Sequence, residues 1–348
     1  MATRIVGIDI GSTSVRAVEI EGALKARPTV VRLHEVPLPS GAAKSGEVLE
    51  THTVASALKR LWSAGGFKSK DVVLGMGNQR VIARDLVVPK MSLTQIRESL
   101  PFQVQDMLPM PVSEALLDFY PISEGEGTNG PVVNGLLVAA VKQSVLANVD
   151  AALLAGLTPV EVDLIPFALS RLQARAHGGS GTIAIVDVGS ATTNVVIIIG
   201  GVPQFVRIIP AGGNDATLAI AMSLEIEEGI AENAKRALGL APSAVNPEHR
   251  PILEHIHRAT AELLNSIRNT LSYFDNTHQV ANVERIVLSG GGARLAGFAA
   301  ALQELTRTEV VLSDPFATLA VSKSVGQAPV ETRDSMSVAL GLALGSAA

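Results

Sequence analysis

A short sequence phrase occurs once in each half of this chain. Residues 6–14 read VGIDIGSTS and residues 185–193 read IVDVGSATT; in both, an apolar run ends on a carboxylate, Asp9 or Asp187, before glycine and small hydroxyl residues. Because a second apolar run follows each time, the pattern predicts two strands joined by a tight turn. Backbone N–H groups in such a turn can bind an anion, and the carboxylate can bind a cation. Two copies that face each other would therefore hold the phosphates and metal of a nucleotide.

A single Asp-x-Gly-Ser turn is weak evidence for a binding site, because Asp and Gly occur in turns for conformational reasons alone. The second copy, with matched apolar flanks, favours the nucleotide interpretation. We predict that Asp9 and Asp187 hold a hydrated Mg²⁺ ion, which typically keeps several of its waters, and that they are the candidate catalytic residues. The residues predicted to contact phosphate oxygens are Gly11, Ser12, Thr13, Ser14, Gly189, Ser190, Thr192 and Thr193.

A third glycine-rich turn stands between a predicted strand and a predicted helix, where residues 289–293 read SGGGA. Consecutive glycines let a flat group approach the backbone where any side chain would block it. We predict that this turn forms the wall against which adenine and ribose lie, because it comes one structural unit after the second phosphate turn. The alternative is an ordinary strand-to-helix turn. The residues of this predicted wall are Gly290, Gly291, Gly292 and Ala293.

Two further pairs are candidates for nucleotide contacts. Glu232 and Lys235 lie three residues apart, on one face of a predicted helix, and could reach the ribose and the base. The alternative is a solvated ion pair, worth only ~0.3 kcal/mol. Gly212 and Gly213 follow a predicted strand and either pass close to the nucleotide or only form a turn.

Composition limits the classes of function. A chain of 348 residues is long enough for two lobes, and its 47% hydrophobic residues supply ample core material. A net charge of −5 and only 3% aromatic residues argue against binding of nucleic acid. The absence of cysteine excludes disulfides, thiolate metal sites and cysteine nucleophiles. No signal peptide is predicted and no apolar run approaches the ~18 residues of a membrane helix, so we expect a cytoplasmic protein without a membrane span.

The predicted elements suggest two related α/β lobes with insertions. Ser92 is a candidate helix N-cap, residues 124–130 read as a polar loop, and residues 214–238 read as helical. A helix–strand–strand–helix pattern before residue 160 predicts an inserted α+β subdomain. The expected division is a lobe 1 core of residues 1–84 and 161–180 closed by 330–348, an inserted subdomain of 85–160, a lobe 2 core of 181–212 and 283–329, and a lobe 2 insertion of 213–282.

Taken in order, the two phosphate turns and the adenosine turn resemble those of the actin, Hsp70 and sugar kinase superfamily. Within that superfamily the chain resembles the PilM family of type IV pilus assembly proteins, itself similar to the cell-division protein FtsA. The resemblance covers nearly the whole chain. It depends on residues 7–12, 88–89, 95–97, 117–120, 163, 166–169, 266–268, 273–274, 314–316 and 339–344, and on Glu232-x-x-Lys235, which matches the ribose-contacting helix of the superfamily.

The resemblance implies an α/β fold of the actin-like, ribonuclease H-like kind, duplicated into two lobes, with ATP and Mg²⁺ in the cleft and an inserted 1C subdomain. It implies a scaffold peripheral to the inner membrane, bound to the N-terminal cytoplasmic peptide of a PilN-like protein and connected to other pilus platform and motor components. PilM-like sequences usually have Lys after the first turn where this chain has Arg16. The positive charge near the phosphates is therefore kept, but on a planar guanidinium group instead of a compact ammonium group. We expect ATP turnover to be slow or partner-dependent.

Two alternatives stay open. An FtsA-like protein that self-associates into filaments would share the fold, although FtsA-like proteins tend to end in an amphipathic membrane-targeting helix that residues 345–348 do not predict. A small-molecule kinase would need a catalytic base aimed at a substrate hydroxyl, and the sequence nominates none.

Overall fold

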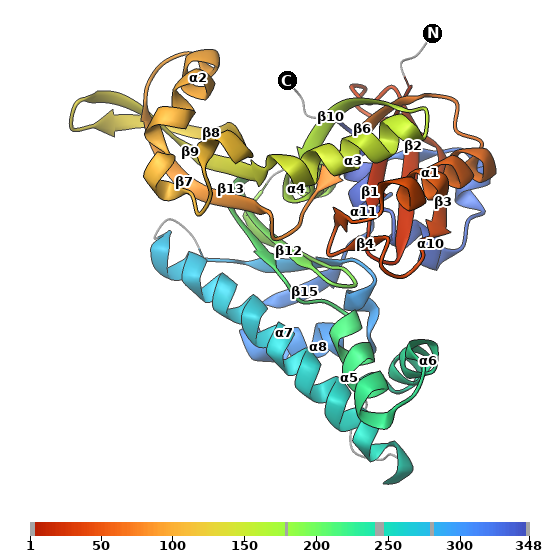
Figure 1. Ribbon diagram of the computed structural model, residues 1–348. Coiled ribbons are helices and arrows are strands. Elements are labelled where there is room, and N and C mark those ends of the chain that lie inside the picture. Colours follow the sequence, from red (N-terminus) through yellow and green to blue (C-terminus); the bar gives the residue numbers. More distant parts are fainter. Residues whose placement is uncertain (1–3, 178–179, 241–246, 279–281, 346–348) are drawn as a thin grey trace.

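The computed structural model describes residues 4–177, 180–240, 247–278 and 282–345. Two lobes, each built on a mixed β-sheet, lie beside each other, and a smaller three-stranded sheet extends from the first (Figure 1). The first sheet has the order β10-β6-β1-β2-β3-β16. Its strands are β1 (Arg4–Ile10), β2 (Ser14–Glu21), β3 (Thr29–Pro37), β6 (Asp71–Met76), β10 (Thr158–Leu164) and β16 (Ala320–Val321).

The second sheet repeats the arrangement of the first. Its order, read from the matching edge, is β15-β14-β11-β12-β13, which corresponds strand for strand to β10-β6-β1-β2-β3. In both sheets the first two strands form an antiparallel hairpin, and a parallel strand lies on the other side of the hairpin's first strand. The duplication predicted from the sequence is therefore confirmed. The strands are β11 (Thr182–Val188), β12 (Thr193–Ile199), β13 (Val202–Ile209), β14 (Arg285–Ser289) and β15 (Glu309–Leu312).

Helices bury both faces of the first sheet. On one face α1 (Thr51–Gly65) and α3 (Lys142–Leu154) pack on the alternating apolar side chains of β1 and β2. On the other face α11 (Ser337–Ala343) lies against β1 so closely that a Cβ on Gly7 would meet the Ala339 carbonyl oxygen at 2.0 Å. The two remaining short helices of this part of the chain are α9 (Lys323–Gly326) and α10 (Val330–Asp334).

One helix joins the lobes. The helix α4 (Ile165–His177) packs in a shared apolar cluster with β6 and α11 of lobe 1 and with β11, β12 and β14 of lobe 2. The opposite face of the second sheet is covered by α7 (Arg250–Thr277) and α8 (Phe298–Thr306). Because the hinge region has a continuous apolar core, the carboxyl ends of β1 and β11 are held near each other.

The sequence predicts one helical stretch over residues 214–238, but the structure has two helices there. These are α5 (Asn214–Leu224) and α6 (Glu228–Leu238), separated where Glu225 takes a left-handed conformation with φ 52°. The pair packs as a small unit against α7. The sequence Asn246-Pro247 also predicts a break in the helical pattern, and Asn246 lies outside the described residues.

The three-stranded sheet has the order β7-β9-β8, from β7 (Val81–Pro89), β8 (Ala115–Gly127) and β9 (Gly130–Val141). One face is covered by α2 (Leu93–Gln103), whose first turn carries the predicted Ser92 cap in a capping box with Gln95. The expected loop at 124–130 is wrong, because the β8–β9 ladder continues to the pair Gly127–Gly130 and leaves only a two-residue connection. The proposed division into subdomains stays a prediction.

No helix of the described segments is both long and apolar enough to cross a membrane. Short 3₁₀ turns, η1 (Gln105–Met107), η2 (Val112–Glu114), η3 (Pro247–His249) and η4 (Gly292–Arg294), and the two-stranded pair β4 (Ala43–Lys44) and β5 (Glu47–Val48) complete the elements.

Candidate functional site

The first repeated turn carries a ladder of charges across three neighbouring strands. Asp9, Arg16 and Glu35 face one another in register on β1, β2 and β3. Arg16 donates from Nη1 to Asp9 Oδ2 at 3.0 Å and from Nε to Glu35 Oε1 at 3.0 Å. The turn itself is closed by the Gly11 N–H, which donates to the Ser14 carbonyl. Strand register therefore places a guanidinium group beside the first turn, between two carboxylates.

The second repeated turn has a matching backbone, but its ladder contains no cation. Asp187, Asn194 and Ile208 occupy the positions that match Asp9, Arg16 and Glu35. Asp187 accepts a hydrogen bond of 2.7 Å from the Ser289 hydroxyl, which stands beside it on β14. The buried Asn194 Oδ1 has no hydrogen-bond partner among the described residues. The second carboxylate is thus held by a hydroxyl group rather than by a cation.

The charge of Asp9 acts on the carboxylate of Asp187. Burial is the main cause that raises the pKa of Asp187; the Ser289 hydrogen bond lowers it and the negative charge of Asp9 raises it, and the net pKa is about 6. Burial also raises the pKa of Asp9, against the opposing effect of Arg16. Both residues are buried, Asp9 at 8% and Asp187 at 7% exposure. The repeated turns therefore face a common site with an excess of negative charge.

Hydrated Mg²⁺ fits this donor set. Two buried carboxylates that repel each other gain from a divalent cation, and Mg²⁺ is usually bound in proteins by one or two carboxylates and several waters. The described residues contain no group of three or more acidic, histidine or cysteine side chains that could enclose a metal ion. Any cation here would therefore depend on water and ligand oxygens for the rest of its coordination.

The third turn and Gly212 are packed against the second turn. A Cβ on Gly290, whose φ is 86°, would lie 2.4 Å from the Val188 carbonyl oxygen, and one on Gly212 would lie 2.6 Å from the Gly189 carbonyl oxygen. Gly213 and Asn214 donate their N–H groups to the carbonyls of the second turn. These glycines are thus required for packing, whereas a Cβ on Gly291 would meet nothing within 4 Å. Gly291 is the position where the predicted adenosine wall is open to a ligand.

Lys235 fastens α6 to the turn at Gly213. Its ammonium group donates to the Gly213 carbonyl at 2.7 Å and to the Thr217 hydroxyl at 2.9 Å, and it pairs with Glu232 at 2.6 Å. Partial burial would raise the pKa of Glu232, but hydrogen bonds from Lys235, Thr217 and Arg236 outweigh it and lower the pKa to about 2. The solvated-pair alternative is wrong for Lys235, which is 7% exposed.

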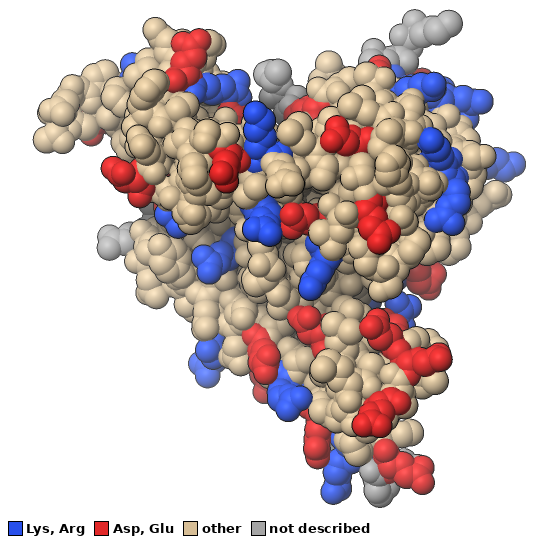
Figure 2. Space-filling view, in the orientation of Figure 1, with Lys and Arg blue, Asp and Glu red and all other residues tan. Residues whose placement is uncertain are grey.

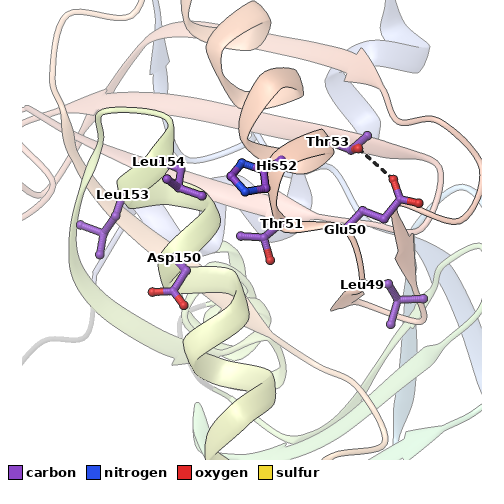
Figure 3. Close-up of a pocket in the computed structure, with 8 residues that line it drawn as sticks. All are labelled: Leu49, Glu50, Thr51, His52, Thr53, Asp150, Leu153 and Leu154. Carbon is purple, nitrogen blue, oxygen red and sulfur yellow. Dashed lines mark hydrogen bonds between the residues drawn. The ribbon is translucent and has the colours of Figure 1, made fainter.

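A separate pocket of about 780 Å³ opens between the start of α1 and the end of α3 (Figure 3). Leu49, Leu153 and Leu154 contribute its apolar surface and are 56%, 54% and 44% exposed. Asp150 places its carboxylate on the same helix as Leu153 and Leu154, while the Glu50 carboxylate accepts a hydrogen bond of 2.8 Å from the Thr53 hydroxyl. The pocket therefore combines unburied apolar area with negative charge, away from the interlobe turns.

Comparison with known proteins decides the family. A profile described as "Type IV pilus assembly protein PilM" matches residues 7–347. The chain belongs to the PilM family. A solved structure described as a "PilM-PilN type IV pilus biogenesis complex" is 29% identical in sequence, with a TM-score of 0.86 over 99% of this chain and 98% of that chain. The predicted relationship and the actin-like fold are confirmed, and the chain is a type IV pilus assembly protein of actin-like architecture.

More distant relatives share parts of this PilM family chain. The cell division protein FtsA of Borreliella burgdorferi is 26% identical over 179 residues, which are 47% of this chain and 42% of FtsA. The chain thus spans less than half the length of that curated relative. MreB5 of Spiroplasma citri, solved with ADP, is 12% identical with a TM-score of 0.55 over 97% of this chain and 94% of that chain, a likeness of fold alone.

Several predicted phosphate ligands of this PilM family member have other partners in the structure. The Ser12 hydroxyl accepts the Ser45 N–H at 2.9 Å, and the buried Thr193 hydroxyl donates to the Ala211 carbonyl at 2.8 Å. The Ser14 hydroxyl is buried without a hydrogen-bond partner among the described residues. The roles proposed for these residues as ligands stay predictions.

Sequence reasoning missed three residues that hold the site. Ser289 binds Asp187, Glu35 binds Arg16, and Thr217 links Glu232 to Lys235. The first two could have been found from strand pairing, because each stands directly across the sheet from its partner. The role of Thr217 depends on the packing of α5 on α6, which no local sequence pattern predicts.

Proposed function

We propose that this chain is a cytoplasmic, ATP-binding scaffold of the type IV pilus assembly platform, and that it binds the N-terminal cytoplasmic tail of a PilN-like membrane protein. The observation that carries the proposal is the likeness to a PilM–PilN complex over nearly the whole of both chains, with a TM-score of 0.86. The partner would recruit the protein to the inner membrane and connect it to the other platform and motor components.

The nucleotide would lie between the repeated turns, with its phosphates near Gly11 and Gly189 and its adenosine near Gly291. Asp9 and Asp187 would hold Mg²⁺ through water, and the bound ion would neutralise phosphate charge. The buried, mutually repelling carboxylates support this assignment. Arg16 and the N–H groups of the turns would orient the phosphates. We expect slow or partner-dependent ATP turnover, with nucleotide acting through its different affinity for open and closed lobes.

The pocket between α1 and α3 is our candidate for the tail's binding site. Its helix α3 begins directly after β9 of the three-stranded sheet, and the last turns of that helix, at the end away from β9, line the pocket. Exposed leucines beside Glu50 and Asp150 suit a segment with apolar and basic residues. Cytoplasmic segments next to a membrane span are enriched in Lys and Arg, so the charge of the pocket complements the expected tail.

The test is titration of a synthetic N-terminal peptide of the neighbouring bitopic membrane protein, with and without Mg-ATP. We expect saturable binding that is reduced at least about tenfold by Leu153→Glu, which adds a charge to an apolar contact. The matched control is Leu312→Glu, at an exposed leucine on β15 of the other lobe. Absence of binding in both conditions would contradict the pilus scaffold proposal. Equal effects of the two variants would contradict the assignment of the pocket as the peptide-binding site.

An FtsA-like filament is the second candidate, since FtsA of Borreliella burgdorferi matches 179 residues of the chain. Filaments would sediment with ATP at low speed, independently of the membrane peptide. Sedimentation that depends on ATP, combined with no peptide binding, would favour this alternative.

A further inference from the structure

One ion pair joins the two lobes next to the third turn. Arg294 is the last residue of η4 and directly follows the predicted adenosine wall in lobe 2. Its Nη2 donates to the Oδ2 of Asp334, the last residue of α10. The segment that contains α10 packs on lobe 1, where the adjoining α11 covers β1 and β2. The pair therefore connects an element of the second sheet with one packed on the first.

The lobe 1 end of this pair is firmly held. The Arg333 guanidinium lies 4.9 Å from the centre of the Phe316 ring, and Met336 is fully buried. Asp334 thus lies between Arg333, which packs on Phe316, and Met336, which shares an apolar cluster with Phe316 and with strands β2 and β3 of lobe 1. Its carboxylate presents a fixed point to which Arg294, on the other lobe, can attach or from which it can detach.

A line of side-chain contacts leads from this point to the first phosphate turn. Ser335, next to Asp334, donates its hydroxyl to Glu35 Oε2 at 3.3 Å. Glu35 in turn accepts from Arg16, which binds Asp9. The contacts between the lobes at Arg294 are therefore continuous with the charges that line the first turn, so the pair borders the same cleft.

The strength of the pair suits a contact that opens. The Arg294 side chain is 36% exposed and that of Asp334 is 39% exposed, so water screens their attraction. The apolar cluster around α4, by contrast, is buried. A hinge held by apolar packing and a solvated pair at the cleft's edge allow the lobes to part without unfolding.

We propose that Arg294 and Asp334 form a clasp that holds the lobes together beside the adenosine turn and slows the release of bound nucleotide. The proposal rests on the proposed nucleotide site. Neither residue belongs to the predicted phosphate, metal or adenosine positions. They act as positioning residues on the lobes, by favouring the closed arrangement.

Charge reversal tests the clasp. Arg294→Glu and Asp334→Arg each replace attraction by repulsion, so each should raise the dissociation rate of a fluorescent ATP analogue about threefold to fivefold, while the double variant restores the parent rate to within about twofold. The matched control is Arg285→Glu, since Arg285 pairs with Glu309 at 2.8 Å inside lobe 2 at similar exposure. Unchanged rates in both single variants, or a double variant that fails to recover, would overturn the proposal.

Small-angle scattering of the ligand-free chain separates this proposal from the nucleotide site. The single reversals should increase the radius of gyration by opening the lobes, and the double variant should return it to the parent value. If the parent protein binds no ATP analogue, the proposed function fails. The scattering experiment still tests the clasp in that case, because it uses the ligand-free chain. Scattering that is identical for all four proteins would overturn the clasp itself.

Discussion

The two lobes share a hairpin, a strand order and an aspartate, yet they surround that aspartate differently. In lobe 1 the ladder reads Asp9, Arg16, Glu35, and in lobe 2 the matching ladder reads Asp187, Asn194, Ile208. The backbone geometry has thus been kept while the charges have diverged. A cation is already present at the first carboxylate, whereas the second has only the Ser289 hydroxyl. The comparison teaches that the lobe 2 carboxylate gains most from an external cation.

The turns that follow the parallel strands differ as well. After β6, Gly77 packs against Ile165 and the lobe 2 residue Asn194. After β14, by contrast, Gly291 borders open space. In lobe 1 this turn packs against α4 and lobe 2, whereas the matching turn of lobe 2 has open space beside Gly291. The charge distribution extends the asymmetry, because acidic side chains gather over α5 and α6 of lobe 2 while charges of both signs are interspersed elsewhere on this face (Figure 2).

The largest expected effect comes from Asp187→Asn. The folded-state pKa of Asp187, about 6, lies above its ordinary value of 3.8. Ionisation of Asp187 therefore lowers the free energy of unfolding by up to about 3 kcal/mol, at about 1.4 kcal/mol for each pKa unit. The stability supplied by the protonated form is fully present below about pH 4 and is lost as pH rises through about 6. The variant should be more stable than the parent by about 2–3 kcal/mol at pH 7.5, without ligand.

Chemical denaturation at pH 7.5 and pH 4 measures this difference. Most of the gain should disappear at pH 4, because Asp187 is then protonated in the folded chain and about half protonated in the unfolded chain. A variant that is less stable than the parent at pH 7.5 would show that the second carboxylate is already satisfied.

Asp9→Asn should lower stability although the pKa of Asp9 is raised as well, because the change leaves Arg16 without its first carboxylate. The change removes one partner of Arg16, whose side chain is 22% exposed, and leaves the guanidinium with Glu35 alone. Because breaking a partly buried pair leaves a charge without one of its partners, we expect the free energy of unfolding to fall by about 1–2 kcal/mol, less than for a fully buried pair because the second carboxylate and solvent remain. Denaturation of both variants in parallel checks the contrast, and equal signs would break the comparison between the lobes.

Gly291→Val should separate binding from stability. The added side chain meets open space, and the backbone angles of Gly291, φ −65° and ψ −34°, suit any residue. We expect the free energy of unfolding to change by less than about 0.5 kcal/mol. The affinity for ATP should fall about tenfold, which is about 1.4 kcal/mol of binding free energy. Gly229→Val in α6, also free of neighbours, is the control. Loss of affinity in both variants would remove the adenosine wall.

Arg16→Lys should have the smallest effect. A lysine ammonium cannot reproduce the fork that binds Asp9 and Glu35 together, so one hydrogen bond, worth about 1 kcal/mol, is lost. A double-mutant cycle with Glu35→Gln measures the coupling. Additive effects would mean that Glu35 does not hold Arg16 in solution.

Much of this arrangement could be predicted from the sequence. The repeated phrase gave both hairpins because strand alternation and the turn glycines are local signals. The split of residues 214–238 could not be foreseen, since Glu225 is no typical left-handed residue and only the packing of α5 on α6 requires it. Likewise, the roles of Gly212 and Gly290 depend on contacts with the second turn, which is distant in sequence. Local chemistry predicted the elements, whereas tertiary contacts decided how the site residues are used.

The central claim is that the two repeated turns form one site for Mg-nucleotide. Calorimetric titration of ATP, with Mg²⁺ and with EDTA, into the parent, Asp9→Asn and Asp187→Asn tests it directly. The account predicts binding by the parent that depends on Mg²⁺, a loss of affinity in both variants, and the larger loss, about 100-fold or 2.7 kcal/mol, for Asp187→Asn. Affinity that is unchanged in both variants would contradict the account.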